Sequence, residues 1–243
     1  VYSIMAVFNV MEKLGLSIDE VDALTGPISG RPKSATFRTA DIVGIDTLVK
    51  VAKNTYADCP NDESRDMFIV PAYVEKLIEN KWLGDKTGNG FFKKVKNAEG
   101  KSEIHVLNLK TFEYTPSAKA KFATVDAAKQ IDDVKSRIKA LHHGTDKAGD
   151  FYRNVTALVN KYVSFRIPEI ADELYKIDDA VKAGFGWELG PFETWDVLGV
   201  EKTAQMMEAS GFAPAAWVKE MTAAGNKSFY ITENGKRKFY DVA

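Results

Sequence analysis

Residues 30–46 read "GRPKSATFRTADIVGID", and residues 192–201 read "FETWDVLGVE". When Phe37 is placed over Phe192, the two stretches agree in residue type at four positions, and the aliphatic residues between these positions also agree. The four pairs are Phe37 and Phe192, Thr39 and Thr194, Asp41 and Asp196, and Gly44 and Gly199. Self-similarity of this kind predicts that the chain contains two copies of one structural unit.

The elements around these stretches also recur in the same order. "SIDE" at 17–20 has the spacing of a helix capping box and corresponds to "KIDD" at 176–179. In the first copy a helix expected over 36–57 is interrupted at Gly44. Each copy continues with a helix opened by proline, Pro71 or Pro214, and closes with an aromatic-rich hairpin, the second of which has Asn234-Gly235 as its turn. The predicted fold class is therefore mainly α, with two tandem copies of a helical domain, each closed by a short β-hairpin.

Three segments follow from this scheme: a first repeat over 1–112, a connector and helix over 113–147, and a second repeat over 148–243. Within the connector, apolar spacing predicts one helix over 124–143, with Thr124 at its N-cap. A long apolar helix is expected over 145–175, and Pro168 is expected to kink or break it.

Composition sets the broad class of protein. The 243 residues carry a net charge of −1, and the lysines look dispersed among acids, so neither nucleic acid nor an anionic membrane is an expected partner. No apolar run approaches the roughly 20 residues of a membrane span. The single cysteine, Cys59, excludes an internal disulfide and is typical of a reducing compartment, so we expect a cytoplasmic protein.

The repeated turn is interpreted as a packing motif. Phe37 and Phe192 are expected to anchor each turn in the core, where a buried ring contributes about 1.5–3 kcal/mol. Asp41 and Asp196 are expected to accept hydrogen bonds from nearby backbone amides. A catalytic role is the alternative, but a catalytic pair is not expected at equivalent positions of two separate copies.

Familiar catalytic motifs do not occur in the sequence. There is no G-x-G-x-x-G, no phosphate-binding P-loop and no G-x-S-x-G nucleophile elbow. The histidines are His105, in an expected strand, and His142 and His143, at an expected helix end, and none has a second ligand at metal-binding spacing. We therefore predict no catalytic residue and no metal site in this chain.

Three motifs carry a family resemblance. "GFGWELGPFETWDVLGVE" at 184–201, with Trp187, Pro191 and Phe192, resembles the signature turn of the C-terminal helical domain of 3-hydroxyacyl-CoA dehydrogenases. "GRPKSATFRTADIVGIDTL" at 30–48 is similar to the variant found in long, multidomain members. "LGDKTGNGFF" at 83–92 is similar to the family's closing segment, normally K-x-G-x-G-F-Y. Two such copies cover nearly the whole chain.

The resemblance implies a set of functional expectations. In the family, a preceding Rossmann domain binds NAD and supplies a histidine and a glutamate, and an asparagine of an "NR" pair opens the first helical domain. That domain is absent here, and Val1 falls just beyond the "NR" position, so the chain is expected to start partway through a longer protein. In the second copy, Phe165 of "SFRIPEIADEL" stands where this asparagine is sought.

The expected function is the C-terminal region of an NAD-dependent 3-hydroxyacyl-CoA dehydrogenase of fatty-acid β-oxidation, inactive in isolation. Its implied partners are acyl-CoA, the absent Rossmann domain, a following enoyl-CoA hydratase domain and a second copy in a homodimer. The first copy has extra residues between Gly26 and Phe37, and these are expected to face the substrate cleft or the cofactor domain. There Arg31, Lys33 and Arg38 are candidates to attract the CoA phosphates, unless they form a solvated polar loop.

Two other functions stay open. The chain is alternatively a non-catalytic helical scaffold or oligomerisation module that shares the fold. A related hydroxyacid dehydrogenase with a different substrate is the third option, although the "GPFE" turn at 190–193 favours the acyl-CoA version.

Overall fold

The computed structural model describes residues 1–242, which form two compact units. Unit 1 comprises Val1–Pro27 and Lys33–Lys121, and unit 2 comprises Ile28–Pro32 and Phe122–Ala243 as far as it is described. Of the predicted connector, residues 113–121 belong to unit 1 and 122–147 to unit 2. The division into repeats at 112 and 148 stays a prediction.

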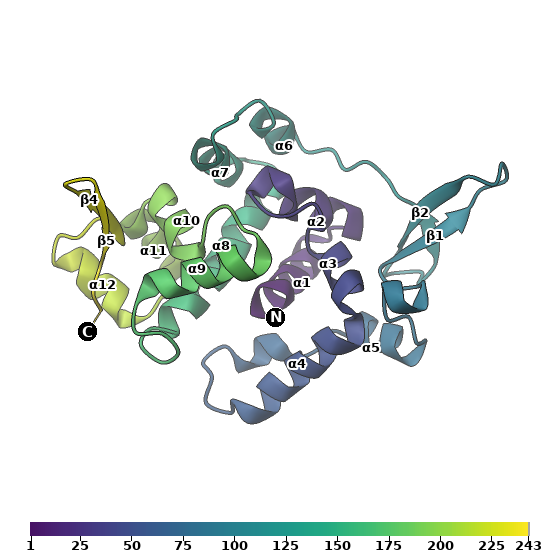
Figure 1. Cartoon of the computed structure of the whole chain (residues 1–243), viewed down its shortest axis with the longest axis horizontal. Coiled ribbons are helices and arrows are strands. Elements are labelled where there is room, and N and C mark those ends of the chain that lie inside the picture. Colours follow the sequence, from purple (N-terminus) through teal and green to yellow (C-terminus); the bar gives the residue numbers. More distant parts are fainter. Residues whose placement is uncertain (243) are drawn as a thin grey trace. The chain divides into compact units, whose positions relative to one another are not determined.

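Unit 1 is a set of helices followed by a small antiparallel sheet (Figure 1). Its helices are α1 (Tyr2–Leu14), α2 (Ile18–Thr25), α3 (Phe37–Val43), α4 (Ile45–Asp58) and α5 (Ala72–Glu79). Its strands are β1 (Phe92–Lys96), β2 (Ser102–Leu107) and β3 (Tyr114–Pro116), paired in that order. The predicted hairpin is thus present, and β3 extends it into the region expected to be a plain connector.

Unit 2 repeats this plan after two additional helices. It contains α6 (Ala123–Ala128), α7 (Val134–His143), α8 (Lys147–Phe165), α9 (Leu174–Phe185), α10 (Pro191–Leu198), α11 (Val200–Ala209) and α12 (Ala216–Ala223). The hairpin of β4 (Tyr230–Glu233) and β5 (Lys236–Phe239) turns at Asn234-Gly235, as predicted. The mainly helical fold with two closing sheets confirms the predicted fold class.

Local sequence accounts for where several helices begin and end. The Ser17 hydroxyl accepts a hydrogen bond from the Glu20 amide, and the Glu20 carboxylate accepts one from the Ser17 amide at 2.8 Å, so the predicted capping box is present. Gly44 separates α3 from α4 with φ at 99°, and Gly199 separates α10 from α11 with φ at 90°. Other residues are strained at such angles, which explains the shared glycine.

A pair of aromatic rings lies at the centre of each repeat. In unit 1 the Phe37 and Phe91 rings meet edge to face with centroids 4.7 Å apart, and both side chains are fully buried. In unit 2 the Phe192 and Phe229 rings repeat this arrangement at 5.0 Å and the same interplanar angle of 73°. Such pairs add about 0.5–1.5 kcal/mol to the stabilisation from burial, so the two repeats share one core design.

One helix prediction was wrong, and another was right about the break but not about the length of the helix. The helix expected over 124–143 is split into α6 and α7, and Thr124 is not its cap. Asp133 instead caps α7 by accepting a hydrogen bond from the Ser136 amide at 2.8 Å, while the Thr124 amide donates to Asp146. The helix expected over 145–175 ends at Phe165, three residues before Pro168. The break expected at Pro168 is therefore present, and the helix is shorter than expected.

The alignment of the repeats also needs correction upstream of the turn. Asp22 and Asp178 occupy equivalent places, so "SIDE" lies over 173–176 and the match to "KIDD" was displaced by three residues. From this aspartate to the shared phenylalanine, the first copy is longer by only one residue. The expected extra residues between Gly26 and Phe37 arise because α2 ends one helical turn sooner than α9.

Candidate functional site

We call α3 and α10, the helices of the repeated stretch, the signature helices. In each repeat one aspartate on the signature helix binds the start of the first strand of the closing hairpin, β1 or β4. The Asp41 carboxylate accepts hydrogen bonds from the Phe91 and Phe92 amides at 2.9 and 2.8 Å. Asp196 accepts from the Phe229 and Tyr230 amides at 2.7 and 2.9 Å. We call each arrangement a closing clamp. The amides lie 50 and 51 residues beyond Asp41 and 33 and 34 residues beyond Asp196, so they are distant in sequence, whereas nearby amides were expected.

A second aspartate in each repeat supports the signature helix itself. Asp22 accepts hydrogen bonds from the Thr36, Phe37 and Arg38 amides at 2.7–3.1 Å. Asp178 accepts from the Phe192 and Glu193 amides at 2.9 and 3.0 Å. These carboxylates satisfy the free amides of α3 and α10, whose own preceding residues provide no side-chain cap. Sequence reasoning missed both residues, although their nearly equal distance from the shared phenylalanine was a usable signal.

Burial shifts the titration of all four aspartates. It raises the pKa of Asp22 to about 7 and the pKa values of Asp41, Asp178 and Asp196 to about 6. The amide hydrogen bonds favour the charged carboxylate and oppose this rise. These carboxylates are engaged by the backbone, so the geometry assigns them to holding the fold.

The glycines of "LGDKTGNGFF" are explained by close approach to the clamp. A methyl group added at Gly90 would lie 2.2 Å from the Asp41 carboxylate oxygen, and one added at Gly84 would lie 2.2 Å from the Asp41 carbonyl oxygen. Atoms that are not bonded to each other cannot lie this close, so a side chain at either glycine would force the backbone or Asp41 to move. The family-like glycine spacing therefore lets the closing segment pack directly on Asp41.

The three candidate phosphate-binding cations do not share one environment. The Arg31 guanidinium lies 4.0 Å from the centre of the Trp187 ring, and burial lowers the pKa of Arg31 to about 10. Arg38 forms a two-pronged ion pair with Asp85, with one contact at 2.8 Å. Lys33 is exposed. Thus Arg31 belongs to unit 2, Lys33 and Arg38 belong to unit 1, and both arginines already have partners.

Residues 28–32 are bound by several groups of unit 2. The Gly30 carbonyl accepts a hydrogen bond from the Glu188 amide at 2.9 Å, and the Ile28 carbonyl accepts one from the Arg137 guanidinium at 2.9 Å. A methyl group added at Gly30 would lie 3.1 Å from the Val134 side chain, a tight contact, and the φ of 70° at Gly30 is one that other residues rarely adopt. The "GRP" part of the opening stretch is therefore a packing segment, not a free loop.

The histidines have structural surroundings. The His142 ring nitrogens lie 2.8 Å from the Ile138 carbonyl and 2.7 Å from the Thr156 hydroxyl, and burial lowers the pKa of His142 to about 4. His143 is exposed at the end of α7, and His105 lies on β2. Over residues 1–242, no three His, Cys, Asp or Glu side chains are grouped so that they could hold a metal ion.

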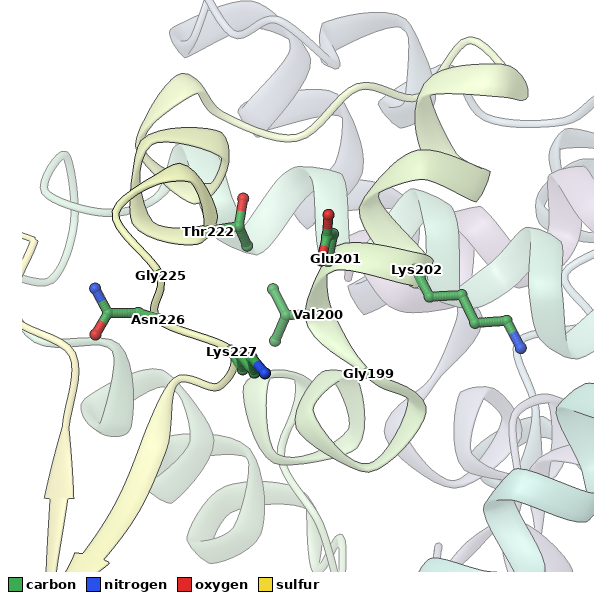
Figure 2. Close-up of a pocket in the computed structure, with 8 residues that line it drawn as sticks. All are labelled: Gly199, Val200, Glu201, Lys202, Thr222, Gly225, Asn226 and Lys227. Carbon is green, nitrogen blue, oxygen red and sulfur yellow. The ribbon is translucent and has the colours of Figure 1, made fainter.

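Unit 2 contains a hollow of about 200 Å³ at the start of α11 (Figure 2). Its lining comprises Gly199, Val200, Glu201, Lys202, Thr222, Gly225, Asn226 and Lys227. In unit 1 the loop after α5 is bonded to the start of α4, because the Leu83 carbonyl accepts a hydrogen bond from the Ile45 amide at 3.2 Å. The loop after α12 is six residues shorter than the loop after α5 before its buried phenylalanine.

Comparisons with known proteins agree with the duplication. The family described as 3-hydroxyacyl-CoA dehydrogenase, C-terminal domain, matches residues 2–94 and 155–241. A probable 3-hydroxyacyl-CoA dehydrogenase of Bacillus subtilis (strain 168) is 43% identical over 240 residues, covering 99% of this chain and 30% of the relative. A putative fatty acid oxidation complex trifunctional enzyme of Rickettsia felis is 28% identical over 167 residues, covering 68% of this chain and 21% of the relative.

A solved structure supports the fold. The 3-hydroxybutyryl-CoA dehydrogenase of Escherichia coli K12 aligns with a TM-score of 0.54 at 12% identity, covering 92% of this chain and 58% of that one. In the described residues, no helix is both long and apolar enough to cross a membrane. The chain thus spans roughly a third or less of the length of the curated relatives named above.

Proposed function

Because this chain belongs to the family of 3-hydroxyacyl-CoA dehydrogenase C-terminal domains, we propose that it is the substrate-cleft and assembly region of an NAD-dependent enzyme of fatty-acid β-oxidation. The parent enzyme would oxidise a 3-hydroxyacyl-CoA to the 3-oxoacyl-CoA. The 43% identity to the Bacillus subtilis relative along 99% of this chain carries the proposal. The expected cytoplasmic location remains a prediction.

The residues of this chain do not fit a dinucleotide. No G-x-G-x-x-G sequence occurs, and the two described sheets are small and antiparallel, unlike the parallel sheet that presents such a loop. NAD would be held by a Rossmann domain outside this chain. This chain would form one wall of the substrate cleft. Its two closing clamps would hold the helices of that wall in place.

The proposal predicts no dehydrogenase turnover by the 243-residue chain alone. NADH formation would be followed after addition of NAD and a 3-hydroxyacyl-CoA, with an intact dehydrogenase as the positive control. Turnover that survives repeated purification would contradict the inactivity of the isolated chain. Reading the gene upstream of Val1 tests the parent: a strand, a G-x-G-x-x-G turn and an "NR" pair are expected there.

Within this proposal, the candidate CoA-phosphate contacts are Arg31, Lys33 and Arg38. Lys33 is the exposed cation of the three, whereas Arg31 and Arg38 would have to leave Trp187 and Asp85. In the parent enzyme, Lys33→Ala is expected to raise KM for the CoA substrate with kcat unchanged. The matched control is Lys50→Ala, at an exposed position of α4. An unchanged KM for Lys33→Ala would exclude Lys33 as a contact of the CoA phosphates.

A scaffold or oligomerisation module is the second candidate function. Ile42 and Val43, adjacent on α3, are 55% and 56% exposed although both are large aliphatic side chains. Contiguous exposed apolar patches mark association surfaces, and this aliphatic pair is the candidate centre of such a patch. If association is the main role, Ile42→Asp should convert a larger assembly to monomers in light scattering, whereas Ile170→Asp, at a 75% exposed position, should not.

A further inference from the structure

The charge of this chain is unevenly distributed, contrary to the dispersal expected from the sequence. Residues 92–121 contain seven lysines, three glutamates and neither arginine nor aspartate, hence a net charge of +4. Since the whole chain has a net charge of −1, the remaining residues carry −5. These thirty residues include all three strands of the unit 1 sheet. The small net charge of the chain therefore conceals one strongly basic element.

The strand register gathers lysines on one side of this sheet. Lys94 pairs with Ile104, and Lys96 pairs with Ser102. Because side chains alternate between the two faces of a strand, these four residues share one face. We call it the lysine face. Both lysines are exposed, and Ile104, opposite Lys94 on the neighbouring strand, is 51% exposed. No acidic side chain lies on this face of the described strands.

The glutamates of this segment do not neutralise the lysine face. Glu99, in the turn, pairs with Lys101 at 3.1 Å. Glu103 points to the opposite face and accepts a hydrogen bond from the Asn97 side chain at 2.6 Å. Glu113 precedes β3. The positive charge of Lys94 and Lys96 is therefore presented to solvent.

The sheet is a fixed platform that presents this charge outward. Its base is held by the Asp41 clamp and by the Tyr114 hydroxyl, which donates to the Gly90 carbonyl at 2.6 Å. The segment after β3 is tied to α2, because the Ala118 amide donates to Asp19 at 2.9 Å. Figure 1 shows the tip of the β1–β2 hairpin lying away from the helices of unit 1.

The chemistry of the lysine face discriminates between classes of anionic partner. Protein interfaces are depleted in lysine at their centre and rely on Trp, Tyr and Arg. Nucleic-acid surfaces use arginine forks and exposed aromatic rings for stacking. Here arginine is absent, and the neighbouring rings are occupied, Phe112 by Trp82 and Lys76, and Tyr114 by Gly90. Clustered lysines beside an aliphatic residue instead suit an anionic bilayer surface, which attracts charge without demanding a fixed geometry.

We propose that the lysine face, Lys94, Lys96 and Ile104 with the adjoining lysines of 92–121, docks this chain on the anionic headgroups of a lipid bilayer. The lysines supply long-range attraction and Ile104 enters the headgroup layer. The contact is peripheral and reversible, because each lysine near such a surface contributes only about fivefold in affinity. It goes beyond the proposed enzymatic role and does not depend on it.

Vesicle co-sedimentation of the full 243-residue chain tests the proposal. Binding is expected to vesicles of phosphatidylcholine mixed with phosphatidylglycerol and not to phosphatidylcholine alone. Raising the salt should release the protein, because the Debye length falls to roughly 3 Å at 1 M. The variant Lys94→Glu/Lys96→Glu should lose at least about tenfold in affinity. Ile104→Ser should weaken binding at high salt more than at low salt.

The matched control makes the same charge change elsewhere. Lys202→Glu/Lys227→Glu alters two exposed lysines of unit 2 and should leave vesicle binding intact. Circular dichroism establishes that each variant remains helical. The proposal is overturned by absence of binding to the mixed vesicles at low salt, or by equal losses in the two double variants. It is also overturned if an oligonucleotide or an acidic protein binds the lysine face more tightly than the mixed vesicles do.

Discussion

At the scale of single residues, two carboxylates per repeat connect parts of the chain that are far apart in sequence. The sequence identified Asp41 and Asp196 as hydrogen-bond acceptors because they recur in the repeated stretch. It could not identify their partners, since the amides at 91–92 and 229–230 approach only after the whole repeat has folded. Asp22 and Asp178 were missed because the repeat alignment was three residues out of register there.

Removing a clamp should destabilise the chain strongly. Asp196→Ala leaves the Phe229 and Tyr230 amides without their acceptor, and each such loss costs about 1–3 kcal/mol. We expect a total loss of about 2–6 kcal/mol in the free energy of unfolding, measured by chemical denaturation. Asp58→Ala, at an exposed end of α4, should change it by less than about 0.5 kcal/mol. Equal effects of the two substitutions would argue against the clamp.

The pKa of Asp22 predicts a pH dependence of stability. Because its folded pKa of about 7 lies above its ordinary value of 3.8, the folded state binds this proton more tightly than the unfolded state. The stabilisation is fully present below pH 3.8 and is lost as the pH rises through 7. Between pH 6 and 8 the free energy of unfolding should fall.

Asp22→Asn separates this contribution from the other titrating groups. The charge of Asp41 also raises the pKa of Asp22, and Asp41 itself has a pKa of about 6. The free energy of unfolding of the variant should therefore still depend on pH. Denaturation curves at pH 6, 7 and 8 should nevertheless show a shallower decline for Asp22→Asn than for the unchanged chain. The same decline in both would show that Asp22 does not titrate in this range.

At the scale of elements, the sequence predicted what local chemistry controls. The capping box of α2, the break at Gly44 and the Asn234-Gly235 hairpin all rest on residues within a few positions of one another. The division of α6 from α7 was missed because apolar spacing continues across it. Asp133 begins a new helix there, and this cap was outweighed by the periodic pattern.

The closing segment of the first repeat should not tolerate a side chain at Gly90. An alanine methyl group would contact Asp41 at 2.2 Å and Gly84 at 2.7 Å, so backbone or clamp must move. Overpacking of this kind costs about 1–3 kcal/mol in the free energy of unfolding. Gly184→Ala is the control, because this α9 position has open space around it and should gain about 0.5–1 kcal/mol. A neutral Gly90→Ala would contradict the packing argument.

At the scale of the whole molecule, the duplication was evident in the sequence, whereas the assignment of residues 28–32 to unit 2 was not. Their contacts with Arg137, Trp187 and Glu188 join positions more than 100 residues apart. No local pattern encodes such a pairing. Arg31 was expected in the substrate cleft only because it is positively charged. Its charge does not reveal that its guanidinium packs on the Trp187 ring.

Loss of the Arg31 contact should loosen the turn that binds residues 28–32. Arg31→Ala removes the cation from Trp187, and the Glu188 amide should then exchange its hydrogen faster with deuterated solvent. Peptides covering 183–190 report this in hydrogen–deuterium exchange. Arg38→Ala, which breaks an ion pair in unit 1, should leave these peptides unchanged. Unaltered exchange in Arg31→Ala would mean that this arginine does not hold the segment.

The discontinuity of unit 2 also governs how the gene can be divided. A truncation that begins at residue 122 would express a polypeptide whose Trp187 and Glu188 lack the pentapeptide that contacts them. One that ends at 121 would leave that pentapeptide with nothing to bind. No single cut therefore yields two complete halves. A recombinant half, or a natural splice of this duplication into another protein, needs residues 28–32 supplied by fusion or as a separate peptide.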